Sequence, residues 1–134
     1  ANVLCQGDGN PNQLMMETDS EQLMHKGVTL ATTNWELGKK ELGWTNEDVD
    51  WVVTHQVGKA HEELTLKTLG LEGTKTHRTY PFLGNTGSSA LPVTLHSLAK
   101  ENIMKTNEKV ALMGIGSGLT SIILGLEWGK LTCK

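Results

Sequence analysis

The feature that most constrains this chain is the alternation of helical apolar spacing with short, wholly apolar runs. The helical spacing is clearest from Met24 to Trp35, where apolar side chains recur at intervals of four, three and four residues along one helix face. The clearest apolar run is Trp51-Val52-Val53, which indicates a buried strand. The full pattern predicts helices near residues 19–42, 57–69 and 88–103, and strands near 49–54, 76–80, 110–115 and 119–126. It favours an α/β layer fold, a mixed sheet with helices on both faces and a C-terminal β-hairpin.

The ends of these elements carry recognisable local chemistry. Thr18 to Glu21 match a capping box with Thr18 as N-cap, and Gly70 stands where a helix C-terminal glycine belongs. Trp35 is interpreted as a core anchor, although an exposed indole would suit a ligand platform. The turn-forming residues between Gly7 and Asn12 predict an irregular N-terminal segment, 1–17, ahead of a single domain, 18–134.

Length and charge exclude several classes of protein. The chain has 134 residues, 12 basic and 15 acidic side chains and a net charge of −3, enough for one domain with its own core. That charge gives no basic field for nucleic acid, and no apolar run reaches the ~18 residues of a membrane span. No signal peptide is evident. Cys5 and Cys133 lack CxxC spacing, so we expect no disulfide framework, no metal site and a cytoplasmic setting.

Three familiar motifs are incomplete. Ser117 lacks the flanking glycines of a nucleophile elbow, and Leu119 stands where a dinucleotide fingerprint needs its third glycine. His61-Glu62 is followed by Thr65 where a zincin needs its second histidine.

Three features remain as candidates. His55 follows the carboxyl end of a buried strand, where α/β sheets gather ligands, although it could simply cap the sheet. Asn85, between Gly84 and Gly87, could donate from its amide to an oxygen or serve only as a turn residue. The glycine turn 114–118 could present backbone N–H groups to an anion while also joining two strands.

In order along the chain, these segments resemble the C-terminal half of β-ketoacyl synthase III-type condensing enzymes of the thiolase superfamily. The resemblance covers residues 18–128 and rests on His55-Gln56, on the run from Tyr80 to Gly87, on the 114–118 turn and on Glu127-Trp128. The form of the glycine turn is more similar to the acyl-CoA-using branch, which includes long-chain head-to-head condensing enzymes.

The resemblance implies an acyltransferase of lipid metabolism with a Cys–His–Asn site. In this family the cysteine takes an acyl group from one thioester, and His and Asn hold the carbonyl oxygen of a second thioester as it becomes an enolate. By this likeness the two catalytic donors are His55 and Asn85. The substrates are thioesters of coenzyme A or acyl carrier protein, and no cofactor or metal is implied. The remaining positions implied are the oxyanion backbone at Ser117 and Gly116, and the substrate-binding residues Gln56, Gly84 and Ile115.

The chain also departs from the family pattern. Gly58 stands where the initiating synthases usually carry Asn, and neither Cys5 nor Cys133 matches the nucleophile, which the family carries in its N-terminal half. The family fold pairs two similar halves, so we expect one apolar helix face to be left uncovered. We therefore expect an inactive isolated chain that is an excised domain or a subunit of a split enzyme, or else a chain that self-associates through the uncovered face. The full protein is expected to be a homodimer.

The sequence allows three functions, of which we predict the first. The chain could supply His55 and Asn85 to a condensing enzyme, or it could be a non-catalytic half-domain that serves dimerisation or acyl-chain binding. The third function is that of a small stand-alone ligand binder.

Overall fold

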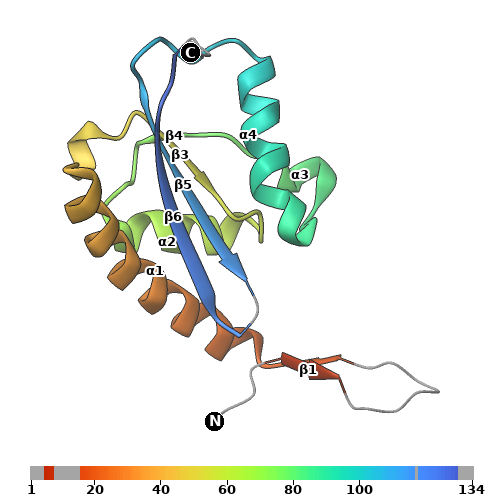
Figure 1. Ribbon diagram of the computed structural model, residues 1–134. Helices are drawn as coiled ribbons and strands as arrows, with labels where there is room; N and C mark the ends of the chain where they lie inside the picture. The colour runs from red at the N-terminus through yellow and green to blue at the C-terminus, as the bar shows by residue number, and fades with distance from the viewer. Residues whose placement is uncertain (1–4, 8–15, 117, 130–134) are drawn as a thin grey trace, which may run out of the picture.

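The computed structural model describes residues 5–7, 16–116 and 118–129, and it shows an α/β fold (Figure 1). The elements are β1 (Cys5–Gly7), β2 (Met16–Thr18), α1 (Ser20–Leu42), the 3₁₀ turn η1 (Asn46–Asp48), β3 (Trp51–Thr54), α2 (Lys59–Leu69), β4 (Lys75–Thr76), α3 (Tyr80–Leu83), the 3₁₀ turn η2 (Gly87–Ser89), α4 (Ala90–Lys100), β5 (Lys109–Gly116) and β6 (Thr120–Glu127).

Four strands form a mixed sheet in the order β4-β3-β5-β6. Strand β3 runs parallel to both β4 and β5, whereas β5 and β6 pair antiparallel as the predicted hairpin. Because β3 and β5 are parallel neighbours, their carboxyl ends, at Thr54 and Gly116, lie at the same edge of the sheet. Ligands of α/β sheets bind at that kind of edge.

The two faces of the sheet carry separate cores, with α1 and α2 on one side and α4 on the other (Figure 1). On the α1 and α2 side, Trp35 is fully buried and donates from Nε1 to Asn46 Oδ1 at 2.9 Å, which confirms it as a core anchor. On the other side, Leu98 of α4 packs with Val53 and Leu112 of the sheet.

Two predictions about the N-terminal region need correction. The N-cap of α1 is Asp19, whose Oδ1 accepts from Gln22 N at 3.0 Å, because Thr18 pairs with Cys5 in the β1–β2 hairpin. The segment 1–17 is therefore not wholly irregular. Its described residues include β1 and part of β2, which form a small sheet of their own.

The chain after β4 also differs from its prediction. The expected strand 76–80 reduces to the two residues of β4, and Tyr80 begins the single helical turn α3 instead. The reason is that the N–H groups of Thr79 and Tyr80 donate to Gln56 Oε1 and so do not pair in the sheet. Gly84 ends this turn with a φ of +65° and a ψ of −158°, a conformation that essentially only glycine adopts.

One face of the edge strand β6 remains open. Ile122, Leu124 and Leu126 alternate on the α4 side as predicted, and Leu126 packs against the core there. Ile122 and Leu124 remain 50% and 46% exposed, while Phe82 of α3 is 68% exposed. The uncovered apolar surface that we expected on a helix therefore lies mainly on β6 and α3.

We predict that Glu108 makes this fold sensitive to acid. Its buried carboxylate accepts from Lys75 Nζ, from Lys105 N at 2.8 Å and from Trp51 Nε1 at 2.8 Å, and these bonds lower its pKa to about 2. A carboxyl whose pKa is depressed by folding stabilises the fold above its unfolded pKa, and that stabilisation is lost as pH falls from about 4.5 toward 2.

Urea unfolding at pH 7, 4 and 3 measures this dependence. Wild type should lose more stability between pH 7 and 3 than Glu108→Gln, which has no carboxylate to protonate. Asp48, whose pKa is also about 2, loses stabilisation in acid as well, but it does so equally in both proteins. Parallel losses in the two proteins would contradict this role of Glu108.

Candidate functional site

His55 lies directly after β3, at the carboxyl edge of the sheet. Its backbone N–H donates to Met113 O of the neighbouring strand at 2.8 Å, which fixes the residue against β5. The side chain is half-buried, and burial lowers the pKa of the imidazole below its usual 6.5. His55 is therefore neutral at pH 7 and has one ring N–H to donate.

The side chain of Gln56 is fully buried and connects β3 to the segment that carries Asn85. Its Nε2 donates to Thr54 O at 2.8 Å, and its Oε1 accepts from Thr79 N at 2.8 Å and from Tyr80 N at 3.1 Å. The carboxamide is thus committed to backbone groups on both sides. These bonds tie the end of β3 to the segment that leads to Asn85, and the substrate contact expected of Gln56 stays a prediction.

Asn85 lies in the exposed loop between α3 and η2. Its Oδ1 accepts from Gly87 N at 3.0 Å, which makes the residue part of a tight turn. Among the described residues its Nδ2 makes no hydrogen bond, so no bond within those residues occupies the N–H groups of the amide. The functional and the turn interpretations of Asn85 are therefore compatible.

The predicted glycine turn, 114–118, overlaps the end of β5, since residues 114–116 still pair with β6, and it lies at the same edge of the sheet as His55. Ile115 is partly buried and lines a small cavity together with His55, whereas Gly116 is exposed. Gly114 lies so close to β6 that a Cβ there would meet Ile122 Cγ2 at 2.8 Å. Ser117 lies outside the described residues, so its expected backbone role stays a prediction.

Glu62 is a site-supporting residue that sequence reasoning missed. It is 2% exposed and accepts from Arg78 Nε, from Thr76 Oγ1 at 3.2 Å and from Tyr80 OH at 3.3 Å, which ties α2 to β4 and α3. The signal was its helical spacing with Thr65, Leu66 and Leu69, all of which are buried on the same face of α2. Its bonds to Arg78 raise the pKa of that guanidinium.

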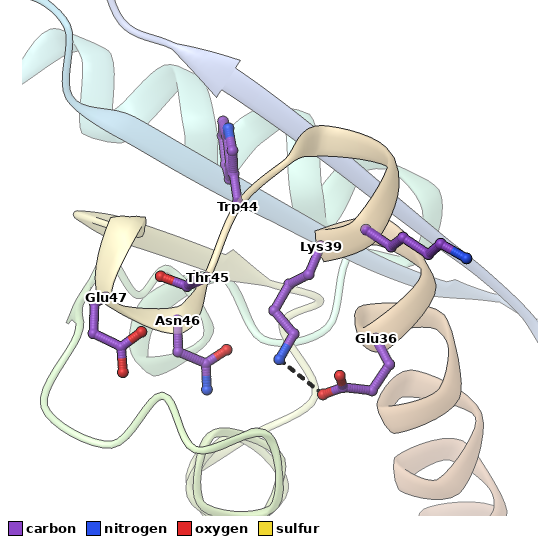
Figure 2. Close-up of a pocket in the computed structure, with 7 residues that line it drawn as sticks. Glu36, Lys39, Trp44, Thr45, Asn46 and Glu47 are labelled. Carbon is purple, nitrogen blue, oxygen red and sulfur yellow. Dashed lines mark ion pairs between the residues drawn. The ribbon is translucent and has the colours of Figure 1, made fainter.

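A larger hollow of about 430 Å³ lies where α1 ends and η1 begins (Figure 2). Its Lys39 pairs with Glu36 at 2.8 Å, and its Asn46 is bonded to Trp35 and to the carbonyls of Leu69 and Gly70. Because η1 precedes β3, this hollow lies beside the amino end of that strand, whereas His55 lies at the carboxyl end. We assign it no part in the site.

Residues 5–7, 16–116 and 118–129 contain no group of three or more His, Cys, Asp or Glu side chains placed to hold a metal ion. No helix in those ranges combines the length and apolar character needed to cross a membrane.

Comparison with known proteins gives the class of the chain: one α/β half of a thiolase-like condensing enzyme. The family model described as 3-oxoacyl-[acyl-carrier-protein] synthase III C terminal matches residues 40–128. The chain therefore belongs to the C-terminal domain family of these synthases, and the matched range contains every site residue expected from the sequence.

Individual relatives agree with this assignment. The chain is 37% identical over 113 residues to the acyl-CoA:acyl-CoA alkyltransferase of Shewanella oneidensis, covering 84% of this chain and 32% of that protein. It is 34% identical over 91 residues to the β-ketoacyl-[acyl-carrier-protein] synthase III of Oceanobacillus iheyensis, covering 68% and 29%.

Among solved structures, a variant of Xanthomonas campestris OleA with bound lauric acid and lauroyl-CoA superposes with a TM-score of 0.82 and 33% identity, over 93% of this chain and 36% of that one. The chain thus spans about a third of the length of the proteins it matches.

Proposed function

We propose that this chain supplies the His and Asn of an acyl-thioester condensing site whose cysteine comes from a second half. The observation that carries the proposal is that hydrogen bonds join the end of β3 to the segment before Asn85 at the carboxyl edge of the sheet. There the half-buried, neutral His55 follows β3, and Gln56 joins that strand to the segment leading to Asn85.

The chemistry of the reaction suits these two donors. Forming a carbanion beside a thioester carbonyl, by loss of a proton or of carbon dioxide, puts negative charge on the carbonyl oxygen. One N–H of His55 and the Nδ2 of Asn85 would hold that oxygen. A neutral imidazole suits this role because it donates a hydrogen bond without giving up its proton. The carbanion then attacks the acyl group on cysteine, the new carbon–carbon bond forms, and the cysteine thiolate leaves.

The glycine turn would assist the same step. As the acyl carbonyl is attacked, its oxygen becomes an oxyanion, and backbone N–H groups around Gly116 and Ser117 would stabilise it. The substrates we propose are acyl thioesters of coenzyme A or acyl carrier protein, with no further cofactor. The names of the relatives and the lauroyl-CoA bound to OleA support this choice.

The missing half is supported by two observations. Cys5 belongs to the β1–β2 hairpin, which forms a sheet separate from the one that carries His55. The relatives are about three times as long as this chain, so they have room for a cysteine-bearing half. We propose that this half covers Ile122 and Leu124, and that the complete protein is a homodimer.

The exposed apolar surface also favours a second candidate function. Ile122, Leu124 and Phe82 would equally serve a half-domain that only dimerises or shields an acyl chain. Such a domain would need the apolar face but neither His55 nor Asn85.

Complementation tests the proposed function. We expect acyl-CoA condensation when this chain is combined with the cysteine-bearing N-terminal half of the Shewanella alkyltransferase, and none from either half alone. Leu124→Lys should weaken assembly about tenfold or more, because it places a charge in an apolar contact. The matched control is Leu37→Lys, since Leu37 is 59% exposed on α1, on the opposite side of the sheet. A complex of two folded halves that forms no product would refute the proposal.

A further inference from the structure

A small cavity lies behind His55, between the sheet and the layer formed by α1 and α2. Its volume is about 30 Å³, and its walls come from α1, α2, β5 and β6 as well as from the end of β3. Thr54 contributes from the end of β3, His55 from the position directly after it, and His61 from α2. The end of β3, which carries the candidate site, therefore forms one wall of the cavity.

Two polar atoms of the residues that line this cavity are buried without a partner. Thr54 is 4% exposed, and neither its Oγ1 nor the Nδ1 of His61 has a hydrogen-bond partner among the described residues. The other hydroxyls lining the cavity are already engaged: Thr65 Oγ1 donates to His61 O at 2.8 Å, and Ser121 Oγ accepts from Asn34 Nδ2 at 3.1 Å. Leaving a buried polar group unbonded costs about 1–3 kcal/mol, so unbonded groups of this kind are rare in folded proteins.

We infer that one water molecule binds in this cavity and bridges Thr54 Oγ1 and His61 Nδ1. A bound water needs roughly 10–15 Å³ and two to four polar partners. The cavity measures about 30 Å³, and two of the residues that line it carry a buried polar atom without a partner. A thioester does not fit, because ligand pockets of that kind measure about 300 Å³ or more. A metal ion is also disfavoured, because the described residues contain no group of three His, Cys, Asp or Glu side chains placed to hold one.

The bridging water gives Thr54 and His61 a defined orientation behind His55. Burial and the nearby His55 both lower the pKa of His61. A neutral His61 can donate to or accept from water at Nδ1, according to its tautomer. The water site stands independently of the catalytic role proposed for His55.

The sign of one substitution tests the inference. Thr54→Val replaces the hydroxyl by a methyl group of similar size. If water bridges the hydroxyl, the variant loses a hydrogen bond, and we expect its Tm to fall by roughly 3–6 °C. If the hydroxyl is unbonded, the same change removes a buried polar group and raises Tm, which would overturn the inference. The control is Thr120→Val on an exposed position of β6, where we expect a change within about 2 °C.

A high-resolution crystal structure of the wild-type protein tests the site directly. We expect solvent density within hydrogen-bonding distance of both Thr54 Oγ1 and His61 Nδ1. An empty cavity, or a direct hydrogen bond between the two side chains, would overturn the inference even if the Thr54→Val variant folded poorly.

Discussion

Replacing His55 by Ala is expected to lower the condensation rate of the assembled enzyme by roughly 10²–10³-fold. Removing one preorganised donor to a developing oxyanion typically costs that factor. Asn85→Ala should cause a loss of similar size, since both side chains are proposed to hold the same oxygen. The measurement is kcat for acyl-CoA condensation by the complemented enzyme, together with Tm to show that the variants fold.

His96→Ala is the matched control, because His96 is exposed on α4. We expect it to keep the wild-type rate within about twofold. The pH profile adds an independent check. Because burial lowers the pKa of His55, the neutral form persists below pH 6.5, and the rate should fall only as pH drops further. If His55→Ala and His96→Ala behave alike, the chain acts as a non-catalytic half-domain.

The position of His55 could be predicted from the sequence because it depends on a local pattern. The run Trp51-Val52-Val53 is apolar on both sides, so it had to be a strand buried on both faces, and a residue just past it had to lie at the sheet edge. Parallel pairing of β3 with β5 then brings the glycine turn to the same edge.

Other parts of the site could not be predicted because they depend on contacts between distant residues. Gln56 is polar and follows a strand, which suggests exposure, yet its amide is buried by backbone partners more than 20 residues away. Because the N–H groups of Thr79 and Tyr80 donate to that amide, the segment expected to be a strand forms the turn α3 instead. Glu62 is buried for a similar reason, since its partner Arg78 lies 16 residues further along the chain.

The open face of β6 illustrates the limit of periodicity. Alternation predicted correctly that Ile122, Leu124 and Leu126 share one side, but alternation says nothing about what covers that side. In the structure α4 reaches Leu126 and leaves the other two exposed. The sequence therefore located an apolar surface, and only the packing of α4 shows which part of it is free for a partner.

Gln56→Leu is expected to reduce both the stability of the chain and the activity of the complemented enzyme. The substitution keeps the approximate size of the side chain but leaves Thr79 N and Tyr80 N without an acceptor and Thr54 O without its side-chain donor. At about 1–3 kcal/mol for each unsatisfied buried group, we expect a loss of roughly 3 kcal/mol or more in the free energy of unfolding. Urea unfolding measures this loss.

Gln56→Glu distinguishes the contribution of the accepting oxygen of the amide from that of its donating nitrogen. The introduced carboxyl can still accept from Thr79 N and Tyr80 N, but when ionised it opposes Thr54 O without a proton to donate. Burial raises the pKa of such a carboxyl, so the stability of this variant relative to wild type should fall as pH rises through that pKa. Gln56→Leu has no such group, and its deficit should not depend on pH in this way.

Activity in the complemented enzyme then distinguishes positioning from direct binding. If Gln56 positions the loop of Asn85, Gln56→Leu lowers kcat more than it raises KM, because the donor is displaced while substrate contacts remain. If Gln56 binds substrate directly, KM rises while kcat and the free energy of unfolding stay close to wild type. The second result would contradict the positioning role that we predict for Gln56 from its complete burial.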